Sequence, residues 1–183
     1  MREHRPNQVQ TREIGAEHIL RGIRTMPCPT SEKINNILIT DVLSYWRSLA
    51  PRDSIPFKDA FDPLGLRPLA LPRVFLIDIL AEERSYRLRL QGTYLVNAYG
   101  VDFTGRYMND SEIPNVTKSR TYRLLHQIVA SGEPQYDMGP TSFRFTDYYT
   151  DVEQVVMPLT DRSGRITHVV GAVDYPGYSP LRH

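Results

Sequence analysis

Apolar residues recur at intervals of three and four positions between Glu32 and Leu49, and this spacing predicts an amphipathic α-helix. Pro51 ends the pattern, because proline cannot continue a helix. The apolar stripe either packs on the helix's own domain or pairs with a second copy of the chain. Its members are our candidate dimer interface: Ile34, Leu38, Val42, Tyr45, Trp46 and Leu49. A weaker helical pattern, interrupted by two glycines, runs over 11–24.

Five stretches rich in branched and aromatic residues predict β-strands, over 73–80, 85–92, 141–150, 151–161 and 165–175. The short link between the first two and the Asp161–Gly164 turn between the last two predict antiparallel hairpins. The strands at 73–80 and 165–175 are apolar on both sides, so we expect both faces of the sheet to be covered. The helix over 32–49 is the candidate cover for the far face.

Two further helical stretches separate the strand groups. Residues Tyr94 to Tyr99 predict a short helix that Gly100 ends, and Asn115 to Ser131 predict a longer helix that Gly132 caps. The order of elements predicts an α+β fold, with a five-stranded antiparallel sheet, helices on one face and an N-terminal helical extension.

The chain of 183 residues divides into four parts on this pattern. We expect a polar arm over 1–33, the amphipathic helix with a proline-rich connector over 34–72, a compact domain over 73–177 and a short tail over 178–183. The connector has five prolines between 51 and 72, which block regular structure, but it also carries apolar residues. It is therefore expected to lie along the surface of the domain.

Charge and composition narrow the possible classes of protein. Lysine and arginine number 22 against 21 acidic residues, and such a near-neutral chain argues against nucleic-acid binding. No stretch approaches the length of a membrane-spanning helix, and the polar start lacks the apolar core of a secretory signal. The single cysteine, Cys28, suits a reducing compartment. We therefore expect a cytoplasmic protein without membrane contact.

A search for catalytic or metal-binding patterns finds little. The five histidines are not spaced as a metal-binding pair on one element, and neither a nucleophile elbow nor a phosphate-binding loop is present. Cys28 has no neighbours that would activate its thiol. We therefore predict neither an enzyme nor a metal site.

The order of elements and several short motifs resemble a PAS domain. These motifs are the Gly92–Gly100 stretch after the second strand, Gly105-Arg106, and Ser131-Gly132-Glu133-Pro134 after the long helix. The chain is most similar to a family of short stand-alone bacterial PAS-like proteins of unknown function. That resemblance rests on Tyr45-Trp46, Phe61-Asp62-Pro63, the phrase LPRVFLIDIL at 71–80 and the phrase VVMPLTDRSGRITHVVGAV near the end.

The resemblance implies a small, apolar ligand held between the sheet and the helices. Aromatic and methionine side chains can line such a pocket, although they can equally fill a solid core. The candidate ligand-binding residues are Leu90, Tyr94, Tyr99, Phe103, Met108, Thr121, Leu125, Ile128, Phe143, Phe145 and Met157.

The cofactor, if any, stays unknown from the sequence. Some PAS domains bind haem through a histidine on the long helix, where His126 lies here, but the helical period places His126 away from the buried face. The Cys28-Pro29 dipeptide resembles a haem-regulatory motif that often occurs by chance. A cysteinyl-flavin photoreceptor would need a cysteine in the helical region, whereas Cys28 precedes the domain.

We accordingly expect a non-catalytic sensory or signalling module that binds a small ligand or a protein partner, forms a homodimer and acts in trans. The first alternative is a ligand-free dimerisation adaptor. The second is a small-molecule enzyme that uses the same cavity.

Overall fold

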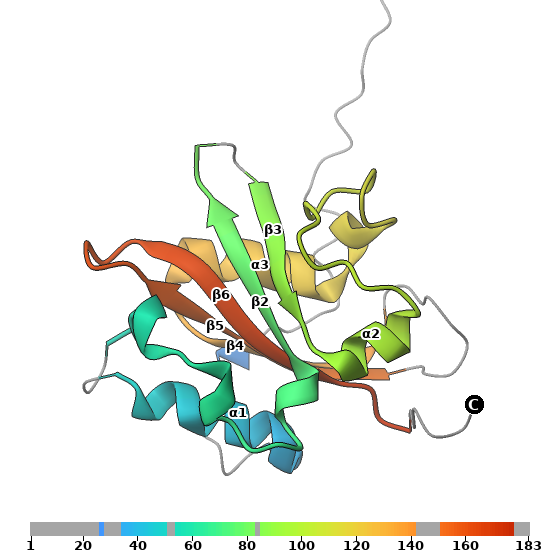
Figure 1. Ribbon diagram of the computed structural model, residues 1–183, viewed down its shortest axis with the longest axis horizontal. Helices are drawn as coiled ribbons and strands as arrows, with labels where there is room; N and C mark the ends of the chain where they lie inside the picture. Colours follow the sequence, from blue (N-terminus) through green and yellow to red (C-terminus); the bar gives the residue numbers. More distant parts are fainter. Residues whose placement is uncertain (1–25, 28–33, 51–53, 83–84, 142–150, 178–183) are drawn as a thin grey trace, which may run out of the picture.

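The computed structural model describes residues 26–27, 34–50, 54–82, 85–141 and 151–177 (Figure 1). Its strands are β1 (Met26–Pro27), β2 (Val74–Leu80), β3 (Ser85–Gln91), β4 (Gln135–Pro140), β5 (Asp151–Thr160) and β6 (Ile166–Asp174). Its α-helices are α1 (Ile37–Ser48), α2 (Thr93–Tyr99) and α3 (Arg120–Ser131). These described residues also contain four 3-10 helices: η3 (Lys58–Ala60), η4 (Pro63–Gly65), η5 (Leu71–Arg73) and η6 (Val116–Lys118).

The strands form one antiparallel sheet in the order β1-β4-β5-β6-β2-β3. The predicted α+β fold, with both hairpins, is confirmed. Two residues, Met26 and Pro27, add a short sixth strand beside β4 that the pattern of apolar residues did not indicate.

The position of β4 differs from the prediction. A strand was expected over 141–150, of which 142–150 lie outside the described residues, whereas β4 occupies Gln135–Pro140. Its two buried positions are polar, Gln135 and Asp137, while Met138 is exposed. The usual alternation of buried apolar and exposed polar residues is therefore inverted in β4, so the pattern of apolar residues did not indicate a strand there.

Helix α1 lies across one face of its own sheet (Figure 1). Asn36 caps it, because its side-chain oxygen accepts hydrogen bonds from Leu38 N at 3.1 Å and Ile39 N at 3.3 Å. The helix therefore begins later than the predicted start at Glu32.

The six residues predicted to form a dimer interface all pack against this face of the sheet instead. Three of them are buried and three are partly buried in the same cluster: Ile34, Val42 and Trp46, then Leu38, Tyr45 and Leu49. The indole Nε1 of Trp46 donates a hydrogen bond to Pro158 O at 2.8 Å. Because the far face of the sheet is apolar, the nearest cover is a helix of the same chain. The prediction of an interface is therefore wrong for the buried Ile34, Val42 and Trp46, and it stays a prediction for the three partly buried side chains.

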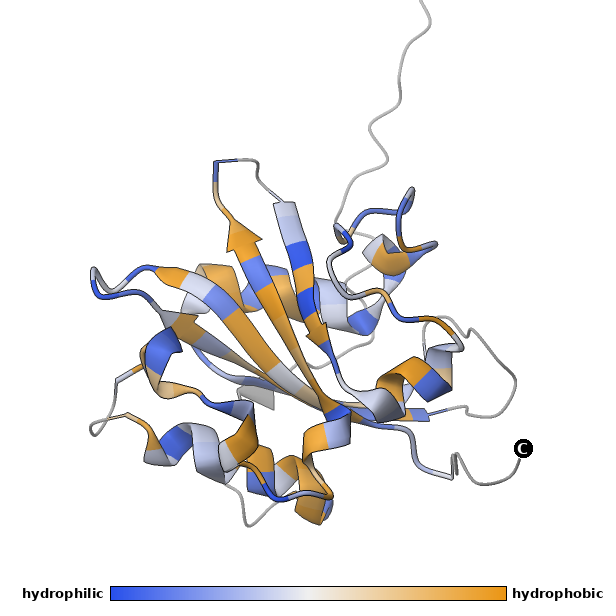
Figure 2. Ribbon diagram, in the orientation of Figure 1, coloured by the Kyte–Doolittle hydropathy of each residue, from blue (hydrophilic) through white to orange (hydrophobic). Residues whose placement is uncertain are grey.

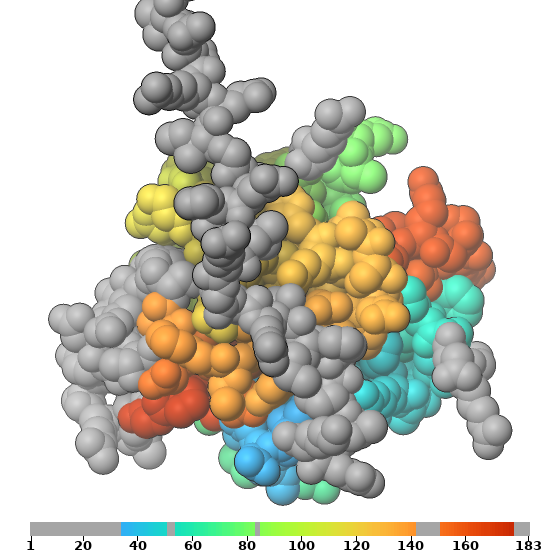
Figure 3. All heavy atoms as spheres, turned by 180° about the vertical axis from the view of Figure 1, so that it is seen from behind, coloured from blue at the N-terminus to red at the C-terminus, as the bar shows by residue number. Residues whose placement is uncertain are grey.

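The opposite face of the sheet carries α2 and α3, and α3 lies at the surface of this layer in Figure 3. Gly100 and Gly132 end the two helices with φ of 71° and 73°, a left-handed conformation that glycine adopts at low cost. Both helix ends were predicted. The sheet strands between the two helical layers are strongly apolar (Figure 2), as a sheet covered on both sides requires.

The connector folds into three short 3-10 turns along the surface rather than leaving the domain. Thr160 N donates to Pro56 O at 3.0 Å, which ties the start of the connector to the end of β5. Within the part of the chain that the structure describes, no helix is long and apolar enough to cross a membrane.

Candidate functional site

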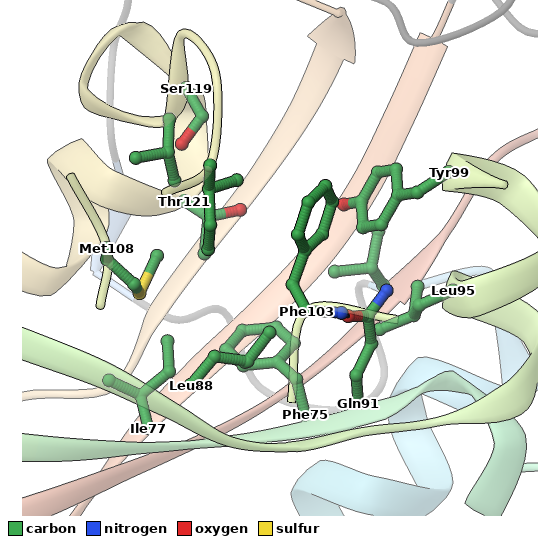
Figure 4. Close-up of a pocket in the computed structure, with 13 residues that line it drawn as sticks. Phe75, Ile77, Leu88, Gln91, Leu95, Tyr99, Phe103, Met108, Ser119 and Thr121 are labelled. Atoms are coloured by element: carbon green, nitrogen blue, oxygen red, sulfur yellow. Dashed lines mark hydrogen bonds between the residues drawn. The ribbon is translucent and has the colours of Figure 1, made fainter. Parts of the chain in front are cut away.

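A cavity of about 80 Å³ lies between the sheet and the α2–α3 layer (Figure 4). Its floor comes from β2, β3 and β6, its sides from α2, and its outer wall from the segment 101–119. The apolar side chains of the floor are Phe75, Ile77, Leu88 and Val173. Leu95 and Tyr99 line it from α2, and Phe103, Met108, Ile113 and Val116 from the outer wall.

The outer wall is held on the free edge of β3 by backbone hydrogen bonds. Gly105 N donates to Leu88 O at 2.7 Å, and Leu88 N donates to Arg106 O at 2.9 Å. Met108 N then donates to Tyr86 O at 2.8 Å. These bonds cover the edge strand and bring the side chain of Met108 over the cavity.

A glycine in β6, Gly171, makes room for an aromatic ring on the floor of the cavity. A Cβ atom at Gly171 of β6 would collide with the ring of Phe75, which belongs to the neighbouring strand β2. Glycine at this position therefore lets the Phe75 ring lie flat across the sheet and line the cavity.

The polar side chains on the wall already have partners within the protein. Gln91 accepts from Phe103 N at 2.8 Å and donates to Val101 O at 3.3 Å, so its amide holds the start of the outer wall. The hydroxyls of Tyr99 and Tyr175 lie 2.6 Å apart. The surface offered to an occupant is consequently mostly apolar.

The two remaining polar residues that line the cavity, Ser119 and Thr121, lie at the start of α3. Ser119 caps the helix by accepting a hydrogen bond from Tyr122 N at 3.1 Å. Thr121 donates to Gln154 Oε1 on β5 at 2.8 Å. Their hydroxyls thus serve to place α3 against the sheet.

Four predicted ligand-binding residues line this cavity: Tyr99, Phe103, Met108 and Thr121. Three more, Tyr94, Leu125 and Ile128, belong to the core cluster on the same face of the sheet without lining the cavity. Phe143 and Phe145 lie outside the described residues.

Leu90 and Met157 belong to the cluster under α1, so the prediction that they face the cavity is wrong. For Leu90 the reason is a β-bulge: Leu76 pairs with Leu90 but the next residue, Ile77, pairs with Leu88. The extra residue, Arg89, shifts the alternation, so Leu88 and Gln91 face the cavity while Leu90 faces α1. Successive residues of β5 point to opposite faces of the sheet. Val156 faces α3, and the next residue, Met157, therefore faces α1.

A series of polar contacts leads from the cavity to the start of α1. Tyr175 N donates to the hydroxyl oxygen of Tyr94 at 3.0 Å, and the guanidinium of Arg73 lies 4.1 Å from the centre of the Tyr94 ring. Arg73 Nε donates to Asp174 at 3.0 Å, and Asp174 accepts from Asn36, the N-cap of α1, at 2.8 Å. The end of β6 therefore contacts both helical layers.

Burial raises the pKa of two tyrosines in this series. For Tyr99 the hydrogen bond with Tyr175 offsets part of the rise in pKa. For Tyr94 burial likewise raises the pKa, and the hydrogen bond with the Tyr175 backbone opposes part of the rise. Both hydroxyls are therefore neutral hydrogen-bonding groups at physiological pH rather than sources of charge.

A buried ion pair lies at the N-terminal end of α3. Two nitrogens of Arg120 each donate to a carboxylate oxygen of Asp137 at 2.5 Å, and both side chains are almost fully buried. Gln154 Nε2 donates to the same carboxylate at 3.1 Å. Since Gln154 also accepts from Thr121, the ion pair is connected to the cavity wall.

A second charged cluster lies on the α1 side of the sheet. The buried carboxylate of Asp78 accepts from Arg87 at 2.8 Å and from Arg89 at 3.3 Å, and His168 Nε2 lies 3.2 Å from it. Burial by itself raises the pKa of Asp78, but the arginines, with a contribution from His168, lower it below 3.8. Desolvation lowers the pKa of His168 although Asp78 opposes that shift.

Because the pKa of His168 is lower in the folded protein than its ordinary 6.5, the unfolded chain takes up a proton first as the pH falls. We expect full stability above about pH 6.5 and a declining free energy of unfolding below it. In urea titrations from pH 7.5 to 5.5, His168→Gln should reduce this decline.

The unmodified chain, titrated over the same pH range, is the reference for this comparison. If the free energy of unfolding declined equally in His168→Gln and in the unmodified chain, the assignment of this pH dependence to His168 would be contradicted. The geometry also fits a neutral His168, whose Nε2–H donates to Asp78 while Nδ1 accepts from Thr167 at 2.9 Å.

His126 lies on the exposed side of α3, as the helical period predicted. It packs against the rings of Tyr86 and Tyr122, and its Nδ1 lies 3.3 Å from the Tyr86 hydroxyl. Among the residues that the structure describes, no three His, Cys, Asp or Glu side chains gather as metal ligands. Cys28 lies outside the described residues.

Comparison with known proteins bears on the fold and the family. No curated protein matches the chain. Among solved structures, an RNA-binding Light-Oxygen-Voltage receptor is similar with a TM-score of 0.45 and 18% identity. The aligned part covers 84% of this chain and 38% of the receptor chain. A family model described as a PAS domain matches residues 36–174, from the cap of α1 to the end of β6. That match spans well over half of the sequence, and the chain therefore belongs to the PAS-domain family.

Proposed function

We propose that this PAS domain is a non-catalytic sensory module that holds a small apolar molecule in the cavity between the sheet and the α2–α3 layer. PAS domains are generic sensory and signalling modules, and the proposal adds the class of ligand. The observation that carries it is the state of the cavity wall: the amide of Gln91 and the hydroxyls of Tyr99, Ser119 and Thr121 are bonded within the protein.

The chemistry of the wall decides between ligand classes. A polar ligand would lose its hydrogen bonds to water and would have to break bonds within the wall to replace them. An apolar ligand loses no such bonds and gains contact with the aromatic and aliphatic side chains of the floor. The cavity therefore favours a small hydrocarbon-like molecule over a sugar, a nucleotide or a charged metabolite.

The position of Tyr99 suggests how an occupant would be detected. Its side chain lines the cavity, and its hydroxyl contacts Tyr175 at the end of β6. The neighbouring residue, Asp174, contacts Asn36 at the cap of α1. A molecule that binds one arrangement of these groups better than another shifts the population between them, and this shift is the signal.

Toluene is a suitable probe, because it is small and apolar. We expect it to stabilise the full chain against urea, by about 2.7 kcal/mol at 100 times its Kd. It should also perturb the amide NMR signals of residues around the cavity. Glycerol, as the polar control, should do neither.

Filling the cavity should abolish these effects. Val116→Phe adds a ring to the outer wall, whereas Val129→Phe makes the same change at an exposed position of α3. The first variant should lose the toluene response and the second should keep it. Ile113→Phe is a second cavity variant in case Val116→Phe does not fold. A toluene response that survives in folded cavity variants would refute the proposed site.

The two alternatives predict different results. A ligand-free dimerisation adaptor would show no stabilisation by toluene and no bound molecule in native mass spectrometry of the purified protein. An enzyme would need reactive polar groups in the cavity, but the polar groups described there are engaged in structural hydrogen bonds.

A further inference from the structure

Three large apolar side chains stand out by their exposure. Leu64, Leu69 and Ile37 are 80%, 74% and 64% exposed, the highest values among the large apolar residues that the structure describes. A single exposed leucine is common on a protein surface. These three, however, come from α1 and from the connector, which lie side by side (Figure 1).

An ion pair between the two elements brings these side chains together. Arg67 Nη1 of the connector lies 3.4 Å from Asp41 Oδ2 of α1. Ile37 precedes Asp41 by one helical turn and so lies on the same side of α1. Leu64 and Leu69 lie three residues before and two residues after Arg67. The three apolar residues therefore lie within one turn of α1 or three residues of the connector from this ion pair.

A second set of contacts places Leu69 near the start of α1. Leu69 O accepts from Arg73 Nη1 at 3.1 Å, and Arg73 Nε donates to Asp174 at 3.0 Å. Asp174 also accepts from Asn36, the residue before Ile37. This route is independent of the ion pair and ends at the same part of α1.

The connector backbone is anchored at the patch. Tyr45 of α1 donates to Asp62 O at 3.0 Å, and the Asp62 side chain accepts from Leu64 N at 2.9 Å. Gly65 lies so close to the Tyr45 ring that a Cβ atom would collide with it. Leu64 is therefore presented to solvent by an ordered turn, so binding there needs little further ordering.

We propose that Ile37, Asp41, Leu64, Arg67 and Leu69, named here the α1–connector patch, form the contact face of a homodimer. A two-fold axis brings the same patch of two copies together. One carboxylate beside one guanidinium is complementary to itself under that axis, because Arg67 then faces Asp41 of the partner subunit and the reverse contact forms too. The exposed apolar side chains are removed from water at the same time.

This interface uses the outer surface of α1 and leaves its inner side chains on their own sheet. It does not depend on what the cavity holds, so its success or failure is separate from that of the ligand proposal. It also explains why the ion pair lies among exposed apolar residues, where an isolated surface pair contributes little to stability.

The test measures the molar mass of the full chain by sedimentation equilibrium over a range of concentrations. We expect a dimer for the unmodified chain. Asp41→Arg and Arg67→Asp each place like charges at the axis and should weaken dimerisation at least about tenfold. Val129→Arg changes a 46%-exposed residue of α3, outside the patch, and should have no effect.

Mixing the two charge variants gives the decisive result. Each variant still carries two like charges within its own patch, so the pair inside the chain stays broken in the mixture. A contact between chains, in contrast, is restored, because the patch of one variant is positive and that of the other negative. We expect a heterodimer on mixing, weakened by salt.

Circular dichroism establishes that each variant is folded. An unmodified chain that stays monomeric at all concentrations would overturn the proposal. So would a dimer that persists in both single variants, or variants that stay monomeric when mixed.

Discussion

Replacement of Asp137 by alanine is expected to lower the free energy of unfolding by about 3–5 kcal/mol. The substitution leaves the guanidinium of Arg120 almost fully buried without its carboxylate partner. Its remaining described contacts are the carbonyl oxygens of Met138 and Pro140, both at 3.3 Å, which carry no full charge. Gln154 loses a hydrogen-bond acceptor as well. Urea unfolding followed by circular dichroism measures the loss.

A double variant separates the cost of the orphaned charge from a general loss of packing. Replacing both partners, as in Arg120→Met with Asp137→Leu, removes both buried charges and puts apolar side chains in their place. We expect this double variant to be more stable than Asp137→Ala alone, so the two sites should not be additive. Glu133→Ala, at an exposed position just before β4, should change the free energy by less than about 0.5 kcal/mol. A loss below about 1 kcal/mol for Asp137→Ala would contradict the role of the pair.

The second large effect concerns Trp46, the single tryptophan of the chain. Trp46→Ala removes a buried ring from the cluster between α1 and the sheet, and it should cost about 3–5 kcal/mol of the free energy of unfolding. Trp46→Phe keeps a ring but leaves Pro158 O without the indole donor, so a smaller loss of about 1–3 kcal/mol is expected. Ser44→Ala is the control, because Ser44 is exposed on the same helix.

This series distinguishes packing of α1 within the chain from packing between chains. If α1 covers its own sheet, the difference in the free energy of unfolding between the unmodified chain and Trp46→Ala is the same at every protein concentration, because Trp46 then contacts no second chain. A difference that grows with protein concentration would show that Trp46 contacts a second chain. Urea titrations at two concentrations a hundredfold apart make this comparison.

The elements with strong local patterns were predictable from the sequence. The spacing of apolar residues located α1, and the runs of branched residues located β2, β5 and β6 to within one or two positions. Gly100 and Gly132 marked the ends of two helices, because the left-handed conformation at a helix end favours glycine whatever the surrounding fold.

Part of the cavity was predictable for the same reason. Tyr99, Phe103, Met108 and Thr121 come from the region that follows the first hairpin, and the resemblance to PAS domains pointed to that region. Gln91 and Phe75 were missed. Their place on the cavity wall depends on a bulge at Arg89 and on the room beside Gly171, and neither has a signal in the pattern of residues.

The sequence by itself indicated the family through the motifs that resemble PAS domains. It also determined the kinds of elements and the need for cover on both faces of the sheet, because these follow from local periodicity and from the total of apolar residues. The tertiary structure decided which side chains contact one another. Pairing across strands turned Leu90 and Met157 away from the cavity and brought Arg120 to Asp137. It also placed α1 on its own sheet, which left a different side of that helix exposed. Such choices depend on contacts between residues far apart in the chain, and local periodicity does not encode them.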